Sequence, residues 1–140
     1  KRKLREMTRR HSGRALATIR DELNRYIVGW VNYFALADAQ GHMKRLDEWL
    51  RRRLRQMCWN QWKTPRNRYK NLLRLGVPPH WAKLNAGTSL GDWRMSNSPW
   101  LHRALSNARW RNFGLKGSYN FTHFVILNRT AGCGPACPVV

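Results

Sequence analysis

The stretch that decides the fold is residues 15–36, which read ALATIRDELNRYIVGWVNYFAL. Its apolar residues recur at steps of three and four, and at 100° per residue such steps fall on one stripe of a helix. The stripe consists of Leu16, Ile19, Leu23, Tyr26, Ile27, Trp30 and Phe34. We therefore predict an amphipathic helix over 15–36, and we expect Leu23, Trp30, Tyr33 and Phe34 to lie in the core.

A second periodic stretch predicts a helix over 43–63. Its apolar face consists of Met43, Leu46, Leu50, Leu54 and Met57, and we expect Leu46, Leu50 and Leu54 in the core. Thr64 and Pro65 suit the cap and first turn of a third helix over 65–75, which Gly76 ends. The three helices together predict an all-α bundle.

The segments that follow Gly76 are shorter. We predict a two-turn helix ended by Gly87 and a loop that leads to Ser98, which would cap a helix over 99–112. Aromatic alternation over 118–127 is typical of a strand, although a short helix also fits. The basic leader 1–11 holds too few apolar residues to pack alone.

The charge of the chain points to a polyanionic partner. The sequence carries 27 Lys and Arg against 7 Asp and Glu, a net charge of +20, and a compact domain with this imbalance repels itself. Eleven of the 27 cations lie within 41–74. Eight tryptophans argue against a disordered tail, because large aromatic side chains need burial or stacking.

The second helix supplies the main candidate site. Its cations lie on the side away from Leu46, Leu50 and Leu54, where an exposed row could dock on the phosphates of an RNA duplex. The predicted nucleic-acid-binding residues are Lys44, Arg45, Arg51, Arg52, Arg55, Lys63, Arg66 and Arg94. Trp59 and Trp62 lie on the same side and could stack on bases, but packing against the later segments is the favoured interpretation. Arg94 and Ser96 fit either a phosphate site or a loop held by local hydrogen bonds.

Other classes of site find little support. Three cysteines make neither a closed disulfide framework nor a four-ligand zinc pattern, and we expect no metal site, with Cys133 and Cys137 unpaired. His102 and His123 have no carboxylate at helical spacing, so we predict no catalytic residues. No apolar run is long enough for a membrane span, and we expect an intracellular, cytoplasmic protein. The chain opens at Lys1 without an initiator methionine, and we expect it to be a piece of a longer protein.

Several motifs resemble those of one family. Residues 23–34, LNRYIVGWVNYF, resemble the LNxxLxGWxNYF signature of the maturase-specific domain of group II intron reverse transcriptases. Residues 46–55, LDEWLRRRLR, and 59–63, WNQWK, are similar to that family's LDxWIRRRLR and WxQWK. LRLGV at 73–77 and WRMSNSP at 93–99 resemble its LxxLG and WRxxxSP elements, so the resemblance covers residues 4–125.

The resemblance implies an architecture and a role. It implies a three-helix thumb, called domain X, over 4–76, a helical extension like the family's DNA-binding region over 77–125, and an irregular tail over 126–140. It also favours a helix over 118–127. In this family the thumb holds the template–primer and helps to grip intron RNA for splicing. The implied partners are group II intron RNA and an RNA–DNA template–primer duplex, with target DNA as a further partner. The resemblance also indicates a bacterial source, although organellar relatives exist. We expect no membrane partner, and the oligomeric state stays unassigned.

The resemblance also implies what this chain lacks. The family's polymerase aspartates belong to a YADD-type motif in a palm, and no such motif occurs here. We therefore expect an accessory domain that is not an enzyme and needs no cofactor, because Mg²⁺ would belong to the palm. The alternatives are a stand-alone structural RNA- or DNA-binding protein, a helix-turn-helix DNA binder and a membrane-surface helix.

Overall fold

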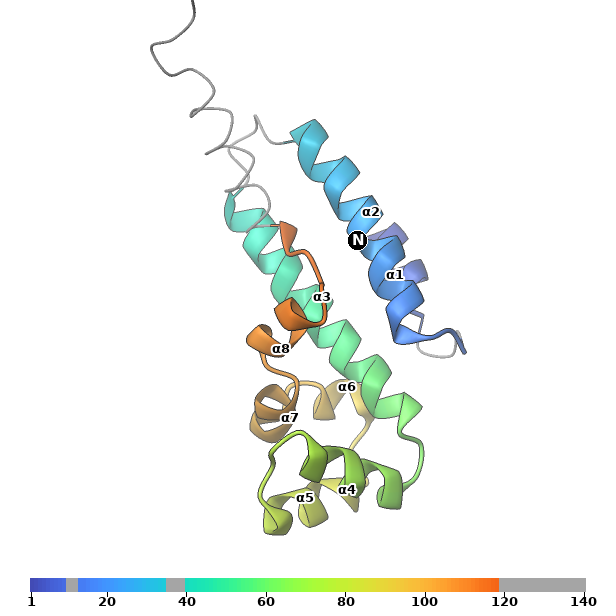
Figure 1. Cartoon of the computed structure of the whole chain (residues 1–140), viewed down its shortest axis with the longest axis vertical. Coiled ribbons are helices and arrows are strands. Elements are labelled where there is room, and N and C mark those ends of the chain that lie inside the picture. Colours follow the sequence, from blue (N-terminus) through green and yellow to red (C-terminus); the bar gives the residue numbers. More distant parts are fainter. Residues whose placement is uncertain (10–12, 35–39, 119–140) are drawn as a thin grey trace, which may run out of the picture.

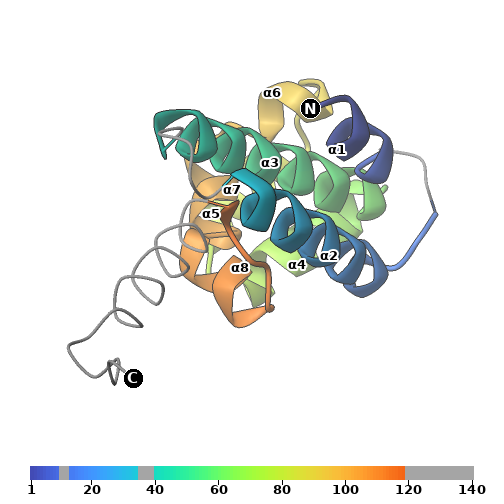
Figure 2. The same cartoon turned by 90° about the horizontal axis from the view of Figure 1, so that it is seen from above.

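Two long helices form the frame of the molecule in a computed structural model that describes residues 1–9, 13–34 and 40–118. These helices are α2 (Leu16–Phe34) and α3 (Gln40–Gln61), and they lie side by side in opposite directions (Figures 1 and 2). The described residues form helices and no strand, so the all-α prediction is confirmed. The helices predicted over 15–36 and 43–63 are therefore present, with shifts of a few residues at their ends.

The core lies between these two helices. Residues one helical turn apart on α2 are fully or almost fully buried: Ile19, Leu23, Ile27 and Val31. They meet Leu46, Leu50 and Leu54 of α3, which are at most 7% exposed, as predicted. Burial of such side chains is the main favourable term in folding, about 1.5–3 kcal/mol for each.

The last turn of α2 departs from the prediction. Trp30 is half-buried and packs against the core, but Tyr33 is 80% exposed, so its predicted place in the core is wrong. Tyr33 follows the buried Val31 by two residues, which rotates it by about 200° and puts it on the opposite face of the helix. The side chain of Phe34 lies outside the described residues.

The basic leader contains a helix of its own, α1 (Arg2–Met7), which the sequence did not predict. Leu4 is buried at 3% exposure, and α1 packs against α2. Arg53 of α3 holds the end of α1 from the other side, because its Nη2 donates to the carbonyl oxygens of Arg5 and Thr8 at 3.3 and 3.0 Å. The leader therefore folds because α2 supplies a packing surface and α3 supplies hydrogen bonds that its own few apolar residues cannot replace.

The chain turns at the lower end of Figure 1 through α4 (Pro65–Arg74) and α5 (Pro79–Ala86), which pack against each other. Thr64 caps α4 by accepting a hydrogen bond from the backbone N–H of Asn67, as the Thr-Pro pair predicts. Gly76, at φ +88°, ends this turn in the left-handed region that glycine adopts without strain. The two-turn helix before Gly87 is α5.

The remaining segment is more broken than predicted. The loop before Ser98 contains a one-turn helix, α6 (Asp92–Met95), and the helix predicted over 99–112 is two helices, α7 (Pro99–Ala104) and α8 (Asn107–Asn112). The break occurs because Ser106 accepts a hydrogen bond from the backbone N–H of Arg109 and so caps a new helix.

Residues 113–118 return along the two long helices. The side chain of Asn24 donates to the Gly114 carbonyl oxygen at 2.7 Å and accepts from the Lys116 N–H at 2.8 Å, so it satisfies two backbone groups of this segment. Ser118 donates from its backbone N–H and its hydroxyl to Asp47 at 2.8 and 2.7 Å. The predictions for residues 119–140, which include His123, Cys133 and Cys137, concern residues outside those that the structure describes.

Candidate nucleic-acid interface

The cationic side of α3 is covered over part of its length by α6. Asp92, the first residue of α6, accepts hydrogen bonds from Gln56 Nε2 at 3.0 Å and Asn60 Nδ2 at 2.6 Å. These two donors are one helical turn apart on α3, so a single carboxylate engages both. Asp92 thus fixes the start of α6 on α3.

Ser96, directly after α6, is the second point of attachment and is completely buried. Arg55 Nε donates to its carbonyl oxygen at 3.0 Å, and Arg52 Nε donates to its hydroxyl at 3.2 Å. Arg52 Nη2 also donates to the Trp93 carbonyl oxygen at 3.1 Å, and its guanidinium lies over the Trp93 ring at 3.9 Å. These bonds support the local hydrogen-bond interpretation of Ser96, and they connect the RRRLR and WRMSNSP motifs in space.

This packing corrects the predicted exposed row of arginines. Arg55 is buried at 4% exposure, and Arg51 and Arg52 are half-buried. These arginines do not form a free helix face, because the α6 segment packs on them. The hydrophobic periodicity of α3 could not reveal this packing, since α6 lies about 40 residues later in the chain. Arg52 and Arg55 donate to carbonyl and hydroxyl oxygens of the α6 segment, while Arg51 makes no hydrogen bond within the described residues. The ion pairs among the described residues involve none of these three arginines.

Three of these arginines line a cavity of about 440 Å³ that we call the arginine pocket. It lies between α3 and the segment from α6 to the start of α8. The lining residues are Arg45, Glu48, Trp49, Arg51, Arg52, Arg55, Trp93, Asn97, His102 and Asn107. The structure thus brings together Arg45, Arg51, Arg52 and Arg55 of the predicted site.

The electrostatics of the arginine pocket are dominated by positive charge. Burial, with the charges of Arg51 and Arg52, lowers the pKa of Arg55 from its usual 12.5 to about 10. Burial and the charges of Arg55 and Arg52 also lower the pKa of His102 below its usual value of 6.5. Burial is the larger cause of both shifts, and the neighbouring guanidinium charges act in the same direction because they disfavour a further cation.

The other predicted binding residues are exposed at separate places. Lys44 lies near the start of α3, Lys63 and Arg66 lie at the junction of α3 and α4, and Arg94 lies on α6. Lys63 has φ 41°, a left-handed conformation that reverses the chain between the two helices. These four cations do not line the arginine pocket, and they present charge directly to solvent.

The two candidate stacking residues are packed inside the fold. Trp59 is 1% exposed, and the Arg68 guanidinium lies 4.5 Å from its ring centre. Trp62 is half-buried and meets Trp59 edge to face, with 6.0 Å between ring centres. Burial of Trp59 excludes base stacking on this residue and agrees with the packing interpretation.

The sequence did not single out a second cavity beside the first. This indole pocket, of about 510 Å³, shares Arg52 and Asn97 with the arginine pocket. Its aromatic wall is made of Trp81 and Trp100, which stack with ring centres 4.9 Å apart, and Arg94 also lines it. The two tryptophans are 19 residues apart in the chain, so no local motif predicts that their rings stack. The high tryptophan content was the one sequence feature that indicated an aromatic site of this kind.

Other chemistry finds no support among the described residues. No group of three or more His, Cys, Asp or Glu side chains there could hold a metal ion. Burial raises the pKa of the Cys58 thiol to about 12, so the reactive thiolate is scarce at neutral pH. None of the described helices has the length and apolar character that a bilayer crossing requires.

Comparison with known proteins places the chain in a family. The sequence model of the family described as "Group II intron, maturase-specific domain" matches residues 1–76, more than half of the chain. No curated protein sequence matches. The matched region includes α1 to α4 and every arginine of the arginine pocket. The chain therefore belongs to the family of group II intron maturase-specific domains.

Proposed function

We propose that this domain binds group II intron RNA through the exposed cations of α3, the α3–α4 junction and α6, and so supports intron splicing. The observation that carries the proposal is the unbalanced charge of this region. The ion pairs among the described residues join Lys3 to Glu6, Arg14 to Glu22 and Arg20 to Asp21, all before α3. The exposed cations of α3, the α3–α4 junction and α6 (Lys44, Lys63, Arg66 and Arg94) take no part in these ion pairs, so they can bind phosphates.

The finer parts of the proposal come from the resemblance. A thumb of a reverse transcriptase would hold an RNA–DNA template–primer with the same basic surface, and target DNA is a further partner. The domain itself is accessory and not catalytic. We infer that it needs no cofactor and that Mg²⁺ would serve a polymerase palm elsewhere in a longer protein.

The test replaces Lys44, Lys63 and Arg66 together with glutamate. All three side chains are exposed, so the fold should persist while RNA affinity falls at least tenfold at moderate salt. Filter binding across a salt series should also give a shallower slope of log affinity against log salt, because fewer counterions are released.

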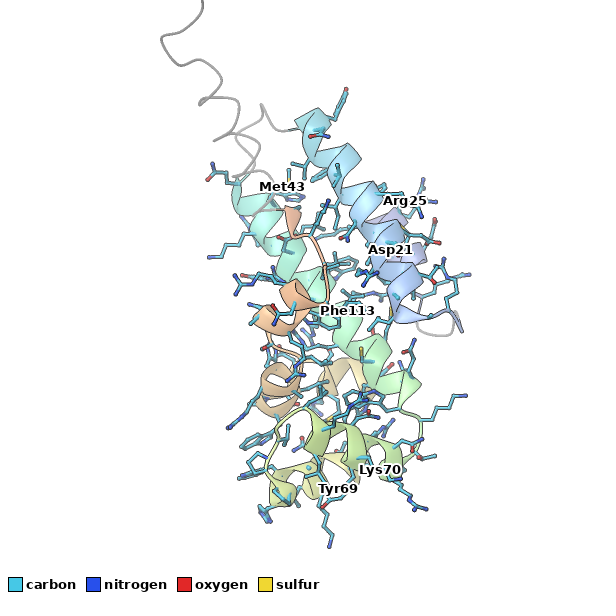
Figure 3. All side chains as sticks on the ribbon, viewed as in Figure 1. Asp21, Arg25, Met43, Tyr69, Lys70 and Phe113 are labelled. Carbon is cyan, nitrogen blue, oxygen red and sulfur yellow. The ribbon has the colours of Figure 1, made fainter. Side chains whose placement is uncertain are left out.

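A matched control separates this surface from total charge. Arg25, Arg109 and Arg111 are also exposed, and their replacement by glutamate changes the net charge equally. Arg25 lies on the side of α2 turned away from α3 (Figure 3). Equal loss of affinity in both triple variants would contradict the proposed surface. Equal binding of intron RNA and random duplex DNA by the unaltered domain would favour a stand-alone nucleic-acid binder.

A further inference from the structure

The arginine pocket contains a buried cation without a matching anion. Arg55 is 4% exposed, and its hydrogen bond among the described residues runs from Nε to the Ser96 carbonyl oxygen at 3.0 Å. Its two terminal nitrogens form no further hydrogen bond or ion pair there. A buried charge is costly unless it is paired, so an anion that reached these nitrogens would stabilise the site.

The surroundings of Arg55 add charge of the same sign. Arg45, Arg51 and Arg52 line the pocket beside it, and His102 completes the set of basic groups. The one carboxylate on the lining belongs to Glu48, which is exposed. Four guanidinium groups against one carboxylate leave a strong excess of positive charge, and guanidinium groups match the oxygen geometry of phosphate.

The size of the cavity limits what can enter. About 440 Å³ suits a single small ligand, and the amide side chains of Asn97 and Asn107 offer neutral donors and acceptors beside the arginines. The phosphates of a paired duplex are held in a regular backbone, so a duplex approaches the buried Arg55 less easily than a flexible strand does. Unpaired nucleotides can be splayed out of an RNA strand, so they can reach a recessed group such as Arg55.

We propose that the arginine pocket binds the phosphate group of one unpaired nucleotide of an RNA strand. Arg51 and the terminal nitrogens of Arg55 donate to the phosphate oxygens, while Arg52 supplies charge and holds the wall at Trp93 and Ser96. The identity of the strand as intron RNA rests on the proposed function, but the phosphate site can be measured without that RNA.

The first experiment titrates the protein with adenosine 5′-monophosphate and follows the ring protons of His102 by NMR. A phosphate in the pocket should shift these signals saturably and raise the pKa of His102 by roughly half a unit to one unit, because an anion favours the imidazolium. His102→Gln assigns the signals. Absence of a saturable shift would overturn the proposal.

Two matched variants show whether the arginine pocket is responsible for the binding of adenosine 5′-monophosphate. Arg51→Gln removes a cation that makes no hydrogen bond among the described residues, so it should leave the fold intact and weaken nucleotide binding at least tenfold. Lys70→Gln removes the same charge from the exposed surface of α4 (Figure 3) and should change binding less than twofold. Equal weakening in the two variants would indicate general charge attraction and contradict a defined pocket.

The second experiment compares a short single-stranded RNA with the same RNA paired in a blunt duplex. The single strand should compete with adenosine 5′-monophosphate for the His102 shift at least tenfold better than the duplex, and equal competition would contradict the requirement for an unpaired nucleotide. Strands with and without a 5′-phosphate distinguish a terminal from an internal phosphate, and either source supports the site. If the unaltered protein shows the His102 shift with adenosine 5′-monophosphate but does not bind intron RNA, the proposed function is rejected and the phosphate site is not.

Discussion

Single residues in this domain take their roles from burial more than from type. Trp59 and Trp81 are the same type of residue, yet Trp59 is 1% exposed and Trp81 is 41% exposed. The arginines divide in the same way, since Arg66 faces solvent while Arg55 is buried beneath α6. Residue type therefore predicted the chemistry of the site, and packing decided which residues are accessible.

Replacement of Trp59 tests the importance of this burial. Trp59→Ala should lower the free energy of unfolding by about 3–5 kcal/mol, because it leaves a large cavity in the core and removes the ring beneath Arg68. Leu84→Ala, at a position that is 55% exposed, should cost less than about 1 kcal/mol. Urea denaturation measures both, and similar losses in the two variants would contradict the packing described for Trp59.

The stability of the fold should depend on pH through the titration of His102. Its pKa is lower in the folded protein than its usual value of 6.5, so below that pH the unfolded chain binds more protons than the folded one. Stability should therefore fall as the pH drops through about 6.5, and His102→Gln should reduce that fall. Urea midpoints at pH 7.5 and pH 5.5 provide the measurement, and an unchanged difference in the variant would be inconsistent with this assignment.

At the scale of elements, the short helices hold the site together. α6 is four residues long and could not persist alone, because isolated helices of this length are unstable in water. It is stabilised by Asp92 at its start and Ser96 at its end, both bonded to α3. Sequence periodicity found the long helices, but it could not find a helix that depends on partners 36 residues away.

The attachment of α6 can be tested at Asp92. Asp92→Ala removes the acceptor for Gln56 and Asn60 and should cost about 1–3 kcal/mol, since the buried Gln56 amide and the half-buried Asn60 amide are left without their partner. Amide exchange should speed up in 92–98 more than in α2. Asp21→Ala, at an exposed acid bonded to its neighbour Arg20, is the control and should be close to neutral. A neutral effect of the Asp92 change would refute this attachment.

At the scale of the whole molecule, one core joins the family-matched region to the rest. The buried cluster contains residues before position 76, such as Leu23 and Leu54, and residues after it, such as Leu101 and Trp110. The boundary predicted at 76 and 77 stays a prediction about domains, but the described packing is continuous across it. Arg55 and Ser96, from the two sides, are in direct contact.

Truncation tests this continuity. A chain of residues 1–76 would expose Trp59, Leu72 and the cationic side of α3 that α6 covers, so it should melt at least 10 °C lower or without a cooperative transition. The full chain should melt in a single step. Circular dichroism melts of both chains make the comparison, and equal midpoints would show that the first region folds independently.

The sequence alone determined the all-α class, the positions of the long helices, several caps and the family, because helical periodicity, capping residues and motif spacing are local properties of the chain. It also determined the charge excess that points to a polyanion. Only the tertiary structure decided that Tyr33 faces solvent, that Arg55 is buried and that four arginines line one pocket. The physical reason is that accessibility depends on which distant segments pack together, and no local pattern records the docking of α6 on the polar side of α3.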